Sequence, residues 1–317
     1  MRFCLMIEGQ EGITWEQWLA ISRACERLGF EALFTSDHYL SVMGARGRGS
    51  NDAWALLAAL AARTERLRLG TLVSPVTFRL PAVLAKAATT VDAISGGRVE
   101  IGMGAGWWEQ EHLAHGFPFP PSAERMRMLE EQLEIVHGLL TQESFSFRGR
   151  HYALERCELL PKPVQRPHPP LIVGGGGGPR IARLAARWAD EFNTVGGTPA
   201  EVAERFARVR DAVDRAGRDQ AAFTTSLMTW VYVGEDDRSL RDRIERARAI
   251  DPRAGAFDEF LAEIERDCIV GTPERAAARL SEYGAAGVQR VMLNHSLFDD
   301  LDTIALLAER VFPLVED

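Results

Sequence analysis

The chain has 317 residues, 46% of them hydrophobic, and its 37 basic and 45 acidic side chains give a formal net charge of −8. This length and apolar content fit one large α/β domain, and the negative charge argues against nucleic acid as a main partner. The four cysteines have no CxxC spacing, no apolar run approaches the ~20 residues of a membrane span, and the N-terminus has no signal-peptide pattern, so we expect a cytoplasmic protein without zinc, disulfides or membrane contact.

The first elements are two strands joined by a helix. Residues 2–7 form an apolar run, and residues 14–28 form a predicted helix because Thr14 and Gln17 have the spacing of a capping box. A second strand, residues 32–35, leads directly into Ser36-Asp37-His38-Tyr39. The glycine-rich loop that follows, residues 41–51, is expected to be exposed and mobile.

The next stretch predicts a parallel βαβ unit. The apolar run 67–73 ends at Ser74-Pro75, the helix 81–95 begins with a proline, and a second apolar run covers 99–103. Two short buried strands joined by a helix are parallel, since parallel neighbours need a crossover. The glycines at 104–106 either let a flat ligand approach the backbone or only let the chain turn.

Strands and helices continue to alternate to the end of the chain. Beyond a second helix at 53–63, we expect helices at 122–140, 180–187, 200–216, within 236–267, at 272–284 and at 301–311, and strands at 171–173, 189–194, 224–233 and 288–293. Eight strands, each followed by a helix, predict a single (β/α)8 TIM barrel domain over residues 1–317. The irregular segment of about 143–170 is predicted to be an insertion over the C-terminal mouth of the barrel.

Five consecutive glycines, Gly174 to Gly178, stand between a strand and a helix. Exposed N–H groups at a helix N-terminus form a cradle for phosphate. The run lacks the Lys-Ser/Thr ending of a nucleotide-hydrolysing loop and the GxGxxG spacing of a dinucleotide fold, so the motif alone does not name the ligand.

His38 is the main candidate for acid–base chemistry. Its ordinary pKa of about 6.5 suits proton transfer near neutrality, and it stands at the carboxyl end of a strand, where barrel enzymes place their active sites. Asp37 is adjacent in sequence but need not contact His38, because neighbours on a strand point to opposite faces.

The segment after strand 99–103 carries further polar and aromatic residues. His112 and His115, with Glu109 and Glu111 nearby, lack a convincing third ligand, so we predict no metal site. Glu109 is expected to be solvated or paired. Trp107 and Trp108 either form a wall for an aromatic ligand or fill space beneath the insertion.

Several short motifs together resemble the bacterial luciferase-like monooxygenase superfamily, and most closely its deazaflavin-dependent branch, which uses coenzyme F420. They are Ser36-Asp37-His38, Gly70-Thr71-Leu72-Val73, Phe78-Arg79 with Pro81, the run from Asp92 to Arg98, the run from Gly102 to Trp107, and the glycines from Gly174 to Gly178. The resemblance covers nearly the whole chain.

The resemblance implies a deazaflavin across the C-terminal mouth, His38 as the catalytic proton donor, acceptor or positioning group, and a non-proline cis peptide at Leu72–Val73. The cofactor-binding residues that it implies are Asp37, His38, Thr71, Leu72, Val73, Ala105, Gly106, Trp107, Gly174, Gly175, Gly176, Gly177 and Gly178. Relatives that oxidise sugar phosphates have a glutamate where this chain has Trp107, so the resemblance does not extend to that activity.

The leading hypothesis is therefore an F420-dependent oxidoreductase that moves a hydride between the deazaflavin and a small organic substrate bound under the 143–170 insertion. One alternative is an FMN-dependent luciferase-like monooxygenase working with a flavin reductase, and another is a flavin- or deazaflavin-binding protein without turnover. A metal-dependent lyase or hydrolase is a weaker alternative. Relatives are often dimers, so a homodimer is expected.

Overall fold

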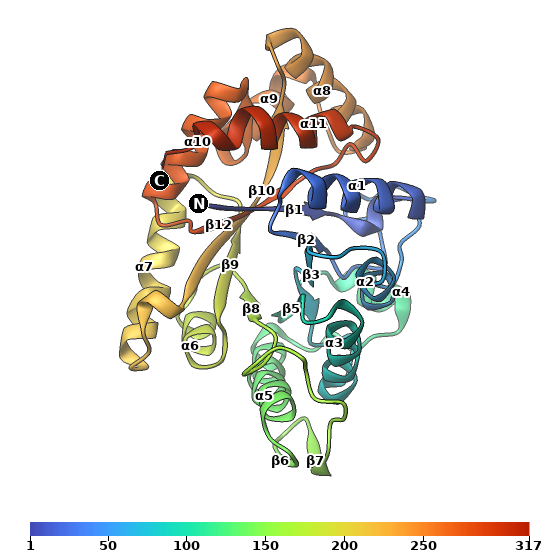
Figure 1. Ribbon diagram of the computed structural model, residues 1–317, viewed down its shortest axis with the longest axis vertical. Helices are drawn as coiled ribbons and strands as arrows, with labels where there is room; N and C mark the ends of the chain where they lie inside the picture. The colour runs from blue at the N-terminus through green and yellow to red at the C-terminus, as the bar shows by residue number, and fades with distance from the viewer. Residues whose placement is uncertain (317) are drawn as a thin grey trace.

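A closed ring of parallel strands forms the centre of the protein. The computed structural model describes residues 1–316, and Figure 1 shows the ring nearly end-on with helices around it. In spatial order the barrel strands are β1 (Arg2–Ile7), β2 (Ala32–Thr35), β3 (Arg68–Thr71), β5 (Val99–Gly104), β8 (Leu171–Gly174), β9 (Glu191–Val195), β10 (Thr224–Val233) and β12 (Arg290–Asn294), with β12 pairing with β1 to close the ring. The predicted TIM barrel is confirmed.

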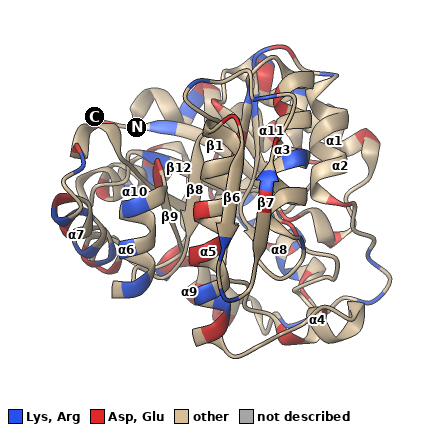
Figure 2. Ribbon diagram, turned by 90° about the horizontal axis from the view of Figure 1, so that it is seen from below, with Lys and Arg blue, Asp and Glu red and all other residues tan. Residues whose placement is uncertain are grey.

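Helices pack around the outside of the barrel. They are α1 (Trp15–Leu28), α2 (Ala53–Ala61), α3 (Pro81–Ser95), α4 (Glu109–His115), α5 (Ser122–Thr141), α6 (Pro179–Trp188), α7 (Pro199–Arg215), α8 (Asp237–Ile250), α9 (Phe257–Asp267), α10 (Pro273–Ala285) and α11 (Leu301–Leu306). The capping box predicted from Thr14 and Gln17 begins α1. Basic and acidic side chains are interspersed on the outer helices such as α7 (Figure 2). None of the helices in residues 1–316 is long and apolar enough to span a bilayer.

The core has two layers because successive residues of a strand face opposite sides of the sheet. On β1, Leu5 and Ile7 pack outward against the helices, whereas Cys4 and Met6 point into the barrel. The apolar part of the interior layer contains Cys4, Met6, Ala32, Phe34, Leu72, Ile172, Met228 and Met292. The barrel is therefore a packed core, and a ligand can enter only at its ends.

Three local features were not specified by the sequence-based predictions. The charged region 236–267, for which the sequence predicted helical structure without a number of helices, forms two helices, α8 and α9. A short strand β11 (Ile269–Gly271) pairs with the far end of β10, which extends beyond the barrel, and β4 (Ser74–Pro75) pairs with the end of β5. The helix α4 was not predicted, because its seven residues are too few for a clear apolar period.

The segment 143–170 does not cover the C-terminal mouth, so that prediction is wrong. Its hairpin of β6 (Phe145–Arg148) and β7 (Ala153–Cys157) lies on the outer side of α5, outside the helix ring (Figure 1). Its last part returns to the amino ends of the strands, where Gln165 donates to the Val99 carbonyl (2.8 Å) and accepts from Arg68 (3.0 Å). A helix that follows a barrel strand runs antiparallel to it, so the connection from helix to next strand lies at the amino end.

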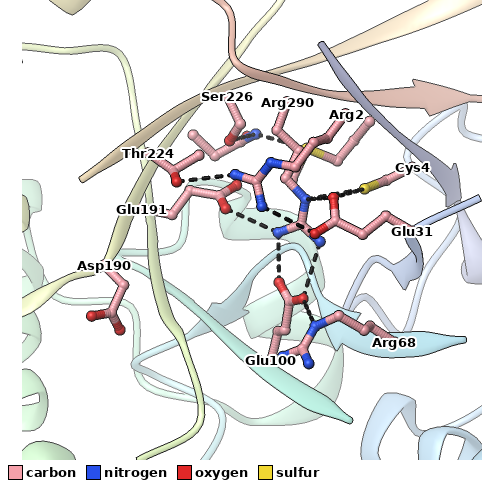
Figure 3. A network of polar contacts seen from close by, with 12 residues as sticks. Arg2, Cys4, Glu31, Arg68, Glu100, Asp190, Glu191, Thr224, Ser226 and Arg290 are labelled. Atoms are coloured by element: carbon pink, nitrogen blue, oxygen red, sulfur yellow. Dashed lines mark hydrogen bonds and ion pairs between the residues drawn. The ribbon is translucent and has the colours of Figure 1, made fainter. Parts of the chain in front are cut away.

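The amino end of the barrel is filled by a buried ionic cluster (Figure 3). The Arg290 guanidinium donates to Glu100 (2.7 and 3.0 Å) and to Glu191 (2.9 Å), and its Nε lies 3.1 Å from Glu31. Arg68 binds Glu100 from the other side (2.5 Å). One cation thus joins carboxylates from β5 and β9 and the residue before β2.

Candidate functional site

The carboxyl end of β3 carries the predicted cis peptide. The Leu72–Val73 bond is cis, as the resemblance implied. The Val73 side chain lies against three glycines, since a Cβ added at Gly102, Gly104 or Gly174 would approach its methyl groups to 3.0, 2.6 and 3.0 Å. The two glycine-rich motifs that begin at Gly102 and at Gly174 therefore have a structural role that the sequence did not reveal. Their glycines leave room for the Val73 side chain.

His38 lies at the carboxyl end of the barrel and is held by a carboxylate that follows β5. Its Nδ1 is 2.8 Å from Oε2 of Glu111, whose Oε1 accepts the backbone N–H groups of Tyr39 (2.5 Å) and Leu40 (3.2 Å). An ionised carboxylate can only accept, so His38 carries a proton on Nδ1 and presents Nε2 elsewhere. The His38 side chain is 17% exposed whereas that of Glu111 is 1% exposed.

The two groups stabilise each other's charged forms. Burial alone lowers the pKa of His38, but the hydrogen bond and the charge of Glu111 outweigh it, so the His38 pKa lies above its ordinary value. Burial raises the pKa of Glu111, yet the contacts with His38 and with the two backbone N–H groups bring it below its ordinary value. His38 is therefore suited to hold or release a proton near neutral pH.

Asp37 belongs to a separate buried network. Its carboxylate is 2% exposed and accepts from the Ser74 hydroxyl (2.6 Å) and from Arg79 (2.5 Å). Arg79 also binds Asp52 (2.6 Å) and the Tyr39 hydroxyl (2.9 Å). Burial raises the pKa of Asp37 despite the attraction of Arg79. The network holds the ends of β2 and β3 together, and within the described residues no hydrogen bond joins the Asp37 carboxylate to His38.

The loop after β5 brings two indole rings to His38. The ring centroid of His38 lies 5.9 Å from that of Trp107 and 6.2 Å from that of Trp108, and both rings stand edge-on to the imidazole. Trp107 is 63% exposed. Since the 143–170 segment lies elsewhere, Trp107 does not fill space beneath it and is free to form a wall of the mouth. Ala105 and Gly106, which adopts a positive φ of 74°, form the turn before it.

The glycine run provides backbone donors at the same end of the barrel. Gly178 is the N-cap of α6 without a side-chain cap, and a Cβ added at Gly176 or Gly178 would meet no atom within 4 Å. The N-terminus of α5 also lacks a side-chain cap, and Arg180 joins the two helix starts by donating to the Ala123 carbonyl (3.0 Å). These adjacent N-termini attract anions.

Neither of the other histidines near the mouth has the surroundings of a metal ligand. His112 is buried between the Trp108 carbonyl (2.7 Å) and the Thr77 hydroxyl (2.6 Å), and His115 contacts the Glu111 carbonyl (3.0 Å). Residues 1–316 contain no group of three or more His, Cys, Asp or Glu side chains arranged to hold a metal ion.

Sequence reasoning missed Glu111 as the partner of His38, having considered it only with the metal candidates. The two residues are 73 positions apart. The available signal was a carboxylate shortly after the β5 glycines, on a segment expected at the same end of the barrel as His38.

Comparisons with known proteins agree with this arrangement. Residues 1–290 match the sequence model of the luciferase-like monooxygenases. The chain belongs to this family. It is 30% identical to an F420-dependent glucose-6-phosphate dehydrogenase of Intrasporangium calvum over 87% of each chain, and 27% identical to an FMNH2-dependent dimethylsulfone monooxygenase of Pseudomonas putida over 94% of this chain and 87% of the relative.

Solved structures of similar proteins have the same fold. The monooxygenase RslO1 from Streptomyces bottropensis superposes with a TM-score of 0.85 at 26% identity, covering 99% of both chains. The relatives therefore include both F420-dependent and FMNH2-dependent enzymes. Because these relatives are oxidoreductases and monooxygenases, the family membership supports an enzyme.

Proposed function

We propose that this protein is an F420-dependent oxidoreductase that transfers a hydride between the deazaflavin and a small organic substrate. The observation that carries the proposal is the His38–Glu111 pair, with Nδ1 held at 2.8 Å and Nε2 left for a ligand at the mouth. Transfer of a hydride to or from a carbonyl carbon requires a matching proton transfer, and histidine suits this role near neutrality.

The surrounding residues fit a flat cofactor with an anionic tail. Trp107 and the backbone at Ala105 and Gly106 border the mouth beside His38, and the open positions at Gly176 and Gly178 leave backbone donors accessible. The N-termini of α5 and α6 lie close together and are joined by Arg180. They can therefore attract a ligand that carries more than one anionic group. A tail with both phosphate and carboxylates, as in F420, uses this extended region more fully than a single phosphate does.

The chemistry divides between cofactor and protein. The deazaflavin, when bound, supplies a centre that gives or accepts a hydride. Glu111 fixes the Nδ1 proton of His38, so that Nε2 is the atom that donates or accepts the substrate's proton. Trp107 and Trp108 limit the movement of the imidazole and reduce its contact with water. Thr71, Leu72 and Val73 form the floor of the mouth in this proposal.

The second candidate is an FMN-dependent monooxygenase that needs a flavin reductase. The kinship to the dimethylsulfone monooxygenase and to RslO1 favours it, since both match nearly the full chain. The two candidates differ in their need for oxygen: hydride transfer between F420 and a substrate needs none, whereas a monooxygenase consumes it.

The test is turnover under anaerobic conditions. Purified protein is mixed with reduced F420 and a panel of ketones, aldehydes, imines and activated alkenes, and separately with oxidised F420 and alcohols or amines, while the F420 absorbance is followed. Oxygen-independent change with at least one substrate is expected. Turnover that requires oxygen and reduced FMN would establish the second candidate instead, and binding without turnover in both systems would favour a carrier protein.

A further inference from the structure

A cavity of about 260 Å³ opens beside the carboxyl ends of β1, β10 and β12. Three neighbouring strands deliver its polar and aromatic residues: Glu8 follows β1, Trp230 lies on β10, and Asn294 ends β12 directly opposite Trp230. The volume corresponds to roughly nine water molecules at ~30 Å³ each, which suits a ligand of about ten non-hydrogen atoms.

Glu8 is the carboxylate of this cavity that no cation neutralises. Its hydrogen-bond partners among residues 1–316 are two neutral amides, Gln10 (2.7 Å) and Asn294 (3.1 Å). The other two acidic residues at the cavity already have arginine partners, since Glu11 binds Arg48 and Asp299 binds Arg246. A negative charge therefore remains at Glu8.

Asn294 adds an unused acceptor next to that charge. It is 1% exposed, and its Oδ1 has no hydrogen-bond partner among residues 1–316. The orientation of the amide follows from Glu8, because a carboxylate accepts only and so must face the NH2 group. An unpaired buried carbonyl is unfavourable, and a donor entering the cavity would satisfy it.

The remaining walls suit the apolar part of an organic cation. The apolar lining residues are Met43, Trp230, Ile250, Leu297 and Phe298, and the neutral polar residues Gln17 and Ser296 also line the cavity. An indole face attracts cations in addition to its apolar contacts. Arg48 is not free to bind an anionic substrate, since it is held by Glu11 and by the Ile250 carbonyl.

This cavity is electrostatically linked to the acid–base pair. The negative charge of Glu8 contributes to raising the pKa of His38. Gln10 connects the two regions, because its Nε2 donates to Glu8 while its Oε1 accepts from Ser36, two residues before His38. A ligand at Glu8 therefore lies on the His38 side of the mouth.

We propose that this cavity binds the ammonium group of a small amine with an apolar or aromatic arm, and that Glu8 and Asn294 determine this specificity. The inference rests on the proposed function, for it names the substrate class of the same site. Sugar phosphates and carboxylic acids are disfavoured, since their charge would approach Glu8.

The test uses two probes of matched shape and different charge. Binding of 2-phenylethylamine and 2-phenylethanol to the full chain is measured calorimetrically at pH 7, with and without F420. The amine is expected to bind the wild-type protein at least about tenfold more tightly than the alcohol. Equal affinity, or tighter binding of the alcohol, would overturn the proposal without any variant.

Two variants with the same change of charge then locate the effect. Glu8→Gln is expected to bring the two probes to within about threefold of each other, whereas Asp299→Asn, which removes an arginine-paired carboxylate of the same cavity, should keep the preference. Retention of the preference in Glu8→Gln, or equal loss in both variants, contradicts the assignment to Glu8. Thermal melting of each variant verifies folding.

The outcome for the proposed function is separate. An amine preference in a protein that binds no F420 would reject the proposed function and leave the cavity's specificity standing. F420 binding with no amine preference would reject only the specificity.

Discussion

The two ends of the barrel both contain a carboxylate paired with a cation, but only one end leaves a reactive atom free. At the amino end, Arg290 is 2% exposed and its guanidinium is shared among Glu100, Glu191 and Glu31. At the carboxyl end, Glu111 holds one nitrogen of His38, and the other nitrogen has no hydrogen-bond partner among residues 1–316. An arginine whose three nitrogens are all engaged stabilises the fold, whereas a histidine with one nitrogen unengaged can exchange a proton with a ligand.

The pKa shifts express the same difference. At the amino end Glu191 is bound by Arg290, which it shares with Glu100, so burial leaves the pKa of Glu191 raised. Glu100 is bound by both Arg290 and Arg68, and they hold its pKa below its ordinary value despite burial. At the carboxyl end the hydrogen bond and charge of Glu111, with smaller contributions from Glu8 and Asp37, raise the pKa of a single histidine. The Arg290 cluster at the amino end holds several buried charges in place, whereas the contacts at the carboxyl end adjust the pKa of one group, His38.

Removal of Arg290 is expected to have the largest effect. Arg290→Leu leaves Glu100 and Glu191 without their shared cation, and a buried pair that loses one partner costs about 3–5 kcal/mol in the free energy of unfolding. Urea denaturation measures this loss. Arg2→Leu is the matched control: Arg2 pairs with Glu31 at the surface, so its loss should cost at most about 1 kcal/mol. Equal effects of the two variants would contradict the structural role of the amino-end cluster.

Removal of the His38 imidazole should abolish its proton transfer at the carboxyl end of the barrel. His38→Ala is expected to reduce the hydride-transfer rate by about 10²–10⁴-fold, as loss of a general acid–base does, with little change in the affinity for F420. Single-turnover kinetics under saturating cofactor separates the two quantities. His115→Ala, which removes a neighbouring imidazole that contacts the Glu111 carbonyl and the rings of Tyr39 and Phe117 but not the His38 imidazole, should keep the rate within about twofold. A rate that is unchanged in His38→Ala would remove His38 from the mechanism.

Glu111→Gln should weaken the pair without removing the imidazole. Glutamine keeps an acceptor for the Tyr39 and Leu40 N–H groups but loses the charge opposite Nδ1, and a hydrogen bond to a charged group contributes about 1.5–3 kcal/mol. The rate should fall roughly ten- to hundredfold, and the limb of its pH profile that reports His38 should move to lower pH.

The same substitution has a defined pH window for stability. Because the folded-state pKa of His38 is raised, the pair stabilises the fold fully below the unfolded value of about 6.5, and this contribution is lost as the pH rises through the folded value. The melting temperatures of wild type and Glu111→Gln should therefore differ most on the acidic side of neutrality and converge above it. If the difference in melting temperature between wild type and Glu111→Gln is independent of pH, Glu111 acts on His38 only through packing.

The smallest effect is expected at the glycines. In Gly104→Ala the new methyl group would lie 2.6 Å from a methyl carbon of Val73, so we expect a loss of about 1–3 kcal/mol in unfolding free energy and weaker cofactor binding. Gly176→Ala places its methyl group in open space and should leave stability unchanged. If Gly176→Ala destabilises the protein as much as Gly104→Ala, the two glycine motifs do not differ in role as described.

The sequence predicted the barrel because its strands and helices have clear apolar periods and clear helix starts, as at Thr14. The position of the cis bond at Leu72–Val73 followed from the family resemblance alone. The pairing of His38 with Glu111, and of Arg290 with Glu100 and Glu191, depends on the closure of the ring, which brings together residues from strands that are not neighbours in it. Such contacts between distant positions leave no local pattern.

The misplaced 143–170 segment has a different cause. Its length and prolines predicted an insertion over the mouth, but the segment follows a helix, and a connection from helix to strand returns to the amino end of the barrel. The direction of the chain was sufficient to place it. The proposed substrate region therefore moves from that segment to the cavity beside Glu8 and Asn294.

The most direct test of the central claim is a titration of the purified apo-protein with F420 and, separately, with FMN, following the fluorescence of each ligand. We expect F420 to bind with micromolar or tighter affinity and FMN to bind much more weakly, since the extended anion-attracting region at α5 and α6 matches the longer tail. Tight binding of FMN with weak binding of F420 would contradict the claim and establish a flavin-dependent monooxygenase in its place.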